Sequence, residues 1–280
     1  MQDNKALNEW VAKLSKSELP VLKHTARDLA ALRVDDNKLT VHSIAHAIKS
    51  DPIMTLKLLR YLQSHKHRAQ TTDVVQVEQA LLMLGIEPFF KHVAPQPLIE
   101  ELLKTHAVAL PPLLRMVHRA HRASEYACDW AVYLHDLHFE EVRMAALLHN
   151  IAEILMWCFA PDAMLKIRDI QQHDKELRSH AVQEQVLGFS LTALQKALVT
   201  QWALPELLHT LLDERSARQP RVHIVNLAIN LARHSANGWD DAALPDDYKD
   251  LGELLHLPTE QAMLMVTADA GVVCDLSKPH

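Results

Sequence analysis

The chain has 280 residues, of which 49% are hydrophobic, 23% are charged and only five are glycine. That much apolar material can form a sizeable core, and the scarcity of the glycines that tight hairpins need predicts an all-α fold. The net charge of −6, without a long stripe of Lys and Arg, argues against nucleic acid as a partner. One local cluster is basic, and we interpret it as a solvated helix face, with an anion contact as the alternative: Arg115, His118, Arg119, His121 and Arg122.

The hydropathy of the chain, its N-terminal segment and its cysteine pattern favour a location in the cytoplasm. The sequence contains no run of about 18 uncharged apolar residues. We therefore expect neither a transmembrane helix nor membrane association. The polar start of the chain lacks the apolar core of a signal peptide. Cys128, Cys158 and Cys274 are odd in number and widely spaced, which is not the pattern of a disulfide framework or a CxxC metal motif.

Apolar periodicity predicts about a dozen helices in two groups. In the first group, Asp51 is expected to cap a helix that begins at Pro52, and Gly85 is expected to end another. The predicted helices of this group cover 3–16, 21–32, 41–50, 52–64, 75–85 and 88–103, the last broken by Pro95 and Pro97.

The second group follows the proline-containing stretch 108–114, which we take as an internal boundary. Its predicted helices cover 112–134, 139–158, 161–173, 175–188, 191–204, 205–214 and 221–236, and a final pair behind the group covers 246–256 and 259–272. The sequence therefore predicts a two-lobed helical bundle. An N-terminal lobe covers 1–107, a helical bundle covers 108–240, and an appendage covers 241–280.

A polar pair interrupts the apolar stretch "AALLHNIAEIL" at 145–155. A histidine followed by an acid in such a setting often holds a metal, but here His149 is followed by the amide Asn150. Asn can offer only a neutral carbonyl oxygen, so the pair by itself makes a poor metal site. The alternative for both residues is structural: a buried histidine and an amide that bond neighbouring helices.

The order of several motifs resembles the HDOD family, the HD-related output domains of bacteria. That family is a degenerate branch of the HD superfamily of metal-dependent phosphohydrolases. The motifs stand in order over about residues 15–235: "DPIMTLKLLRYLQS", "VEQALLMLG", "AALLHNIAEIL" and "EQVLGFSLTALQKALVTQWALPELL". The resemblance implies that the second lobe is an HD-like helical bundle.

The departures from the family pattern affect the positions that would hold a metal. The family's His-Asp-Ile-Gly-Lys segment is His-Asn-Ile-Ala-Glu here, at 149–153. Leu191 stands where many members have a histidine, Gln63-Ser64 replaces Asn-Ser, and Asp213-Glu214 replaces His-His. The first HD-type histidine could be His118 or His121, or its place could be taken by Arg122.

Two functional hypotheses follow from the resemblance. The first is a non-catalytic signal-transduction module that acts through a signalling protein partner or a bound small molecule, in a cleft between the lobes. It needs no cofactor. The alternative is a phosphohydrolase with a rearranged divalent-metal site. The candidate residues for a vestigial site or cleft are His118, His121, His149, Asn150, Glu153 and Asp213.

Overall fold

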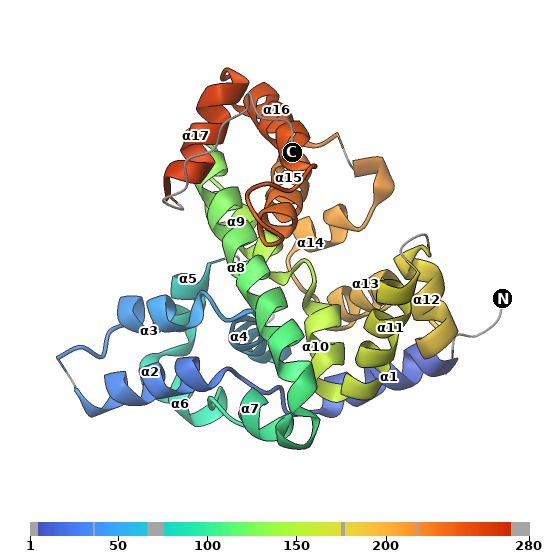
Figure 1. The fold of residues 1–280 in the computed structure, drawn as a ribbon. Helices are drawn as coiled ribbons and strands as arrows, with labels where there is room; N and C mark the ends of the chain where they lie inside the picture. Colours follow the sequence, from blue (N-terminus) through green and yellow to red (C-terminus); the bar gives the residue numbers. More distant parts are fainter. Residues whose placement is uncertain (1–4, 36, 66–75, 175–176, 217, 270–280) are drawn as a thin grey trace. The chain divides into compact units, whose positions relative to one another are not determined.

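The structure, a computed structural model, describes residues 5–35, 37–65, 76–174, 177–216 and 218–269. These residues are almost entirely helical, which confirms the predicted all-α class (Figure 1). The β-type pairing within the described ranges is one isolated parallel bridge, between Val21 and Leu98.

The chain forms two compact units, each built from two separate segments. Unit 1 comprises Met1–Val117 and Leu148–Leu212, and unit 2 comprises His118–Leu147 and Asp213–His280. The units interleave along the chain, whereas the sequence-based division at residues 107 and 240 is sequential. That sequence-based division stays a prediction about folding units.

The helices follow the predicted segments, with shifts at several ends. Unit 1 contains α1 (Lys5–Lys16), α2 (Lys23–Val34), α3 (Val41–Ile48), α4 (Pro52–Ser64), α5 (Val77–Leu84), α6 (Ile86–His92), α7 (Ile99–Leu102), the 3-10 helix η1 (Lys104–Ala109), α10 (Ile151–Phe159), α11 (Pro161–His173), α12 (Ser179–Leu187), α13 (Leu191–Gln201) and α14 (Glu206–Leu211). Unit 2 contains η2 (Glu214–Ser216), α15 (Pro220–Ser235), α16 (Leu244–Leu255) and α17 (Thr259–Asp269). Two further helices cross the unit boundaries: α8 (Leu110–Tyr133) and α9 (Phe139–Leu148).

Two proline-containing stretches affect the helices in different ways. The predicted helix over 88–103 is interrupted after His92 and resumes at Ile99, because the intervening Pro95 and Pro97 cannot donate to a helical ladder. The prolines at 111 and 112 instead lie in the first turn of α8, where a missing N–H costs nothing.

The long helix predicted over 139–158 is a different case, because the structure divides it. Helix α9 ends at Leu148 and α10 begins at Ile151, with His149 and Asn150 in the turn between them. The apolar pattern continues through both helices, so periodicity alone does not show the break.

Asp51 joins the start of α4 to the segment that precedes α2. Its side chain is fully buried and accepts backbone N–H bonds from Ile53 and Met54 at 3.0 Å and from Leu22 at 3.1 Å. The first two bonds are the N-cap that the sequence predicts. Burial raises the pKa of Asp51, and these backbone hydrogen bonds oppose that rise by stabilising the charged form.

Lys57 holds the same segment from the next turn of α4. Its side chain is 5% exposed, and its ammonium donates to the carbonyl oxygen of Gln96 at 2.7 Å and of Leu19 at 3.4 Å. It also pairs with the carboxylate of Glu18. Burial lowers the pKa of Lys57, and Glu18 opposes this by favouring the charged form.

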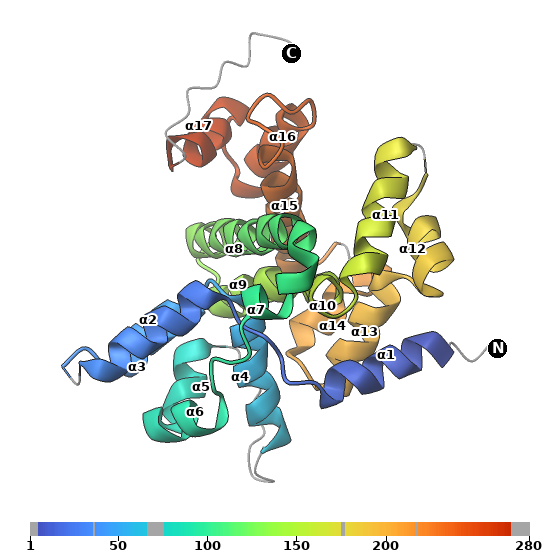
Figure 2. The same ribbon diagram turned by 60° about the horizontal axis from the view of Figure 1, so that its bottom comes forward.

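Helix α10 is the central helix of unit 1, packed against α4, α11 and α13 (Figure 2). Seven of its nine residues are buried: Ile151, Ala152, Ile154, Leu155, Met156, Trp157 and Cys158. The stretch Phe139–Phe159 is long and apolar enough to cross a membrane by length and composition alone. This is weak evidence for a span, because 72% of its most apolar window is buried, as in a core helix.

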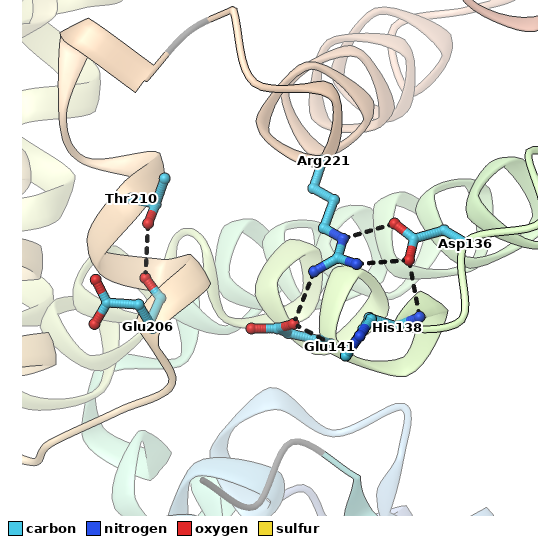
Figure 3. Close-up of polar contacts among 6 residues, drawn as sticks. All are labelled: Asp136, His138, Glu141, Glu206, Thr210 and Arg221. Carbon is cyan, nitrogen blue, oxygen red and sulfur yellow. Dashed lines mark hydrogen bonds and ion pairs between the residues drawn. The ribbon is translucent and has the colours of Figure 1, made fainter. Parts of the chain in front are cut away.

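Unit 2 packs α15 against α16, and α16 against α17. Arg221, at the start of α15, binds both carboxylate oxygens of Asp136 at 2.6 and 2.8 Å (Figure 3). The same guanidinium lies 3.5 Å from a carboxylate oxygen of Glu141. Burial of Asp136 raises its pKa, but the hydrogen bonds from Arg221 and from the His138 backbone N–H outweigh burial and hold the pKa below 3.8.

Replacing Asp51 with Ala should lower the free energy of unfolding by about 3 kcal/mol, because the helix cap is lost and the Leu22 N–H is left buried without an acceptor. Urea unfolding followed by circular dichroism measures this. The control is Asp28→Ala, which removes an exposed pair with Arg27 and should cost less than about 0.5 kcal/mol. Equal losses in the two variants would contradict the role assigned to Asp51.

Candidate functional site

The turn between α9 and α10 is the candidate site in unit 1, because it carries two of the six predicted residues. His149 and Asn150 are half-buried there, and Asn150 leaves helical geometry with φ −106° and ψ 26°. At this turn two helices end, so the last carbonyls of α9 and the first N–H groups of α10 have no partner within their own helices.

Gln195, on α13, binds both of these helix ends. Its amide nitrogen donates to the carbonyl oxygen of Leu148 at 3.0 Å, and its amide oxygen accepts from the N–H of Ala152 at 2.8 Å. Gln195 is 4% exposed, so both bonds are shielded from water. One side chain therefore caps the end of α9 and the start of α10, and it keeps the turn closed.

His149 is bonded to its own neighbour. Its Nδ1 lies 3.0 Å from the Oδ1 of Asn150. Because a carboxamide oxygen only accepts, Nδ1 carries the proton, and the Nε2 of the neutral ring keeps its lone pair. Burial lowers the pKa of His149, and the bond to Asn150 raises it by a smaller amount, so the neutral imidazole is favoured.

The other predicted site residues divide between the units. Glu153 is half-buried in the first turn of α10, in unit 1. His118, His121 and Asp213 belong to unit 2. There His118 is exposed, His121 lies 3.4 Å from Glu125 on the same helix, and the exposed Asp213 accepts a bond from the Arg215 backbone N–H at 3.1 Å. Convergence of all six residues on one site stays a prediction.

The donor set does not fit the divalent metal that an HD-type site implies. Within the described ranges, no three His, Cys, Asp or Glu side chains are grouped so that they could hold a metal ion. Asn150 adds no negative charge, and its amide oxygen is engaged by His149. No catalytic step is therefore assigned to a metal at this turn.

Gln195 is the residue that sequence reasoning missed. It lies between Leu194 and Leu198 on a helix whose other buried residues are aliphatic. A lone amide at a buried helical position signals that some backbone group needs a partner, but it does not say which one. The two groups it binds are 43 and 47 residues away in sequence.

Comparison with known proteins identifies the family. The family model of the HDOD domain matches residues 19–217, so the chain belongs to the HDOD domain family. This confirms the resemblance inferred from the ordered motifs. A search of curated proteins gave no match.

Solved structures share the fold. The chain is similar to the MmoQ response regulator of Methylococcus capsulatus, with 15% identity and a TM-score of 0.69, over 90% of this chain and 99% of that one. It is also similar to a virulence factor of Campylobacter jejuni, with 18% identity and a TM-score of 0.63, over 99% and 95% of the two chains. At these identities the similarity concerns the fold.

Replacing Gln195 with Leu should lower the free energy of unfolding by about 2 to 3 kcal/mol, because a buried N–H and a buried C=O lose their partner while the side-chain volume is kept. Chemical denaturation of the full chain measures the loss. Lys196→Ala, at the exposed neighbouring position, is the control and should change stability by less than about 0.5 kcal/mol. A neutral Gln195→Leu would show that the turn closes without this amide.

His149 should titrate below its ordinary pKa of 6.5, and Asn150→Ala should lower that pKa further by removing the bond that favours protonation. Proton-detected NMR of the imidazole resonances measures both midpoints, with His149→Gln to assign the signal. The unfolded chain binds this proton more tightly than the folded one, so the His149 contribution to stability is lost as the pH falls below 6.5. A midpoint above 6.5 would contradict the neutral ring.

Proposed function

We propose that this protein is a non-catalytic bacterial signal-transduction module of the cytoplasm, acting through contacts with a signalling protein or through a bound small molecule. The observation that carries the proposal is the closed turn between α9 and α10. Its orphan backbone groups are bound by Gln195, and His149 is bound to Asn150, so these polar groups serve the scaffold.

Membership of the HDOD family and the similarity to a protein named as a response regulator support this proposal. A phosphohydrolase would need acidic ligands that neutralise a divalent ion and activate a bound water. At this turn the position after the histidine offers a neutral amide. The scaffold would then transmit a signal through its surface, while its core stays fixed.

Metal content and phosphate release test the proposal on the purified full chain. After dialysis, elemental analysis should find only substoichiometric Mn, Fe, Ni or Zn. Phosphate release from p-nitrophenyl phosphate and nucleotides in added Mn²⁺ should match that of the His149→Ala variant. Stoichiometric metal together with phosphate release that His149→Ala abolishes would overturn the proposal in favour of a rearranged phosphohydrolase site.

A further inference from the structure

Helix α1 lies outside the segment that matches the HDOD family, which begins at residue 19. It packs against α13 in unit 1 (Figure 2). Ala6, near the start of α1, lies close to Gly188, just before α13, while Ser15 bonds to Trp202 at the end of α13. The two helices therefore run in the same direction, over almost the full length of α13.

The segment that follows α1 is fixed to the core. Leu19 and Val21 are fully buried, and Leu22 is 1% exposed. Lys57 binds the carbonyl of Leu19, and Asp51 binds the N–H of Leu22. Any movement of α1 must therefore pivot near Ser17, where the helix has ended and the buried segment has not yet begun.

Helix α1 itself is held only lightly. Leu14 is its one fully buried residue, while Leu7, Trp10 and Val11 are half-buried. Its polar anchors are concentrated at its C-terminal end. Segments with few buried apolar contacts open locally at a small fraction of the global unfolding free energy.

Among the described residues, three hydrogen bonds join this end of α1 to α4 and to the end of α13. The indole Nε1 of Trp202 donates to the hydroxyl of Ser15 at 3.1 Å, and the guanidinium of Arg60 donates to the carbonyls of Leu14 and Ser17, both at 3.2 Å. Arg60 also lies 5.7 Å from the centre of the Trp202 ring. Arg60 thus binds carbonyls that any helix presents at its C-terminal end, while Trp202 binds the side-chain hydroxyl of Ser15.

We propose that α1 is a displaceable arm that covers a helix-binding face of unit 1, formed by α13, Trp202 and Arg60. The arm opens about Ser17 while the rest of unit 1 stays folded. The face then accepts one amphipathic helix of a signalling partner, with apolar residues at the spacing of Leu7, Val11 and Leu14 and a small hydroxyl residue next to the last of them. This step rests on the proposed function for its purpose, since a regulated contact is what a signalling module requires.

Because α1 is tethered, it binds its face at a high effective concentration, and a partner must compete with it. Exposure of the face would therefore depend on how strongly α1 is held, so changes in α1 should alter partner binding without any change in the face itself.

Hydrogen exchange of the full chain tests the opening. Amides of α1 should exchange at least about 100-fold faster than those of α10, without the denaturant dependence of global unfolding. Ser15→Ala should speed α1 exchange about fivefold further, by removing one anchor worth about 1 kcal/mol, and leave α10 unchanged. Asn8→Ala, at an exposed position of α1, is the control. Exchange of α1 at the rate of α10 would overturn the proposal.

A disulfide lock tests the binding face. A Cβ placed at Gly188 lies 3.5 Å from the Cβ of Ala6, within the Cβ–Cβ range of a disulfide. The double variant Ala6→Cys with Gly188→Cys can therefore link α1 covalently to the residue before α13. Gly188 has a positive φ of 81°, so each single variant serves as a control for strain. The probe is a labelled synthetic peptide with the sequence of residues 5–17.

The peptide should bind the reduced double variant at least about tenfold more tightly than the oxidised one, with the unmodified chain resembling the reduced form. Equal binding to both forms would overturn the proposal, as would a concentration-dependent dimer of the unmodified chain, which would make a second copy the occupant. These measurements involve neither metal content nor phosphate release. A negative result here would therefore not contradict the proposed non-catalytic function. Phosphohydrolase activity would, in turn, not contradict the proposed binding face.

Discussion

The buried carboxylate of Asp51 is the interaction on which the rest of unit 1 depends. A fully buried charge is costly unless its oxygens are bonded, and here three backbone N–H groups from two segments supply those bonds. They tie the start of α4 to the residue that leads into α2. On α10, burial and the nearby Asp51 carboxylate both raise the pKa of the Cys158 thiol. The thiol therefore stays protonated. The hydrogen bonds of Asp51 therefore fix the start of α4 and the residue before α2 relative to each other.

The same kind of contact recurs elsewhere in unit 1: a polar side chain on one helix forms hydrogen bonds with backbone groups of another segment. Lys57 binds the carbonyls of Leu19 and Gln96, and Arg60 binds those of Leu14 and Ser17. Gln195 does this at the turn where HD-type chemistry would sit. These groups therefore hold together segments that lie far apart in the sequence.

Local signals in the sequence predicted the helix ends that local chemistry determines. Asp51 and Pro52 begin α4 as expected, and Gly85 ends α5 with a φ of 86°, a value that few other residues adopt. The ordered motifs also identified the family. These features depend on residues within a few positions of one another, so one sequence contains the information.

The break at His149 and Asn150 could not be predicted in the same way. The apolar stripe runs through it without a proline or glycine, and its partner Gln195 is more than forty residues distant. The hinge of α1 is equally non-local, because Lys57 and Asp51 define it from α4. Where the predicted site residues of the two units lie relative to one another is likewise a question that local patterns do not address.

The interleaving of the two units has a consequence for biosynthesis. As the chain leaves the ribosome, α4 is complete long before α10 and α13, the helices that complete its unit, have been made. Residues 118–147, which belong to unit 2, emerge in between and must wait for the C-terminal segment in turn. Neither unit can therefore finish folding before the other has begun to be synthesised. Unit 1 cannot be completed until residue 212 has been made, and until then its early helices lack the α10 and α13 partners that cover their apolar faces.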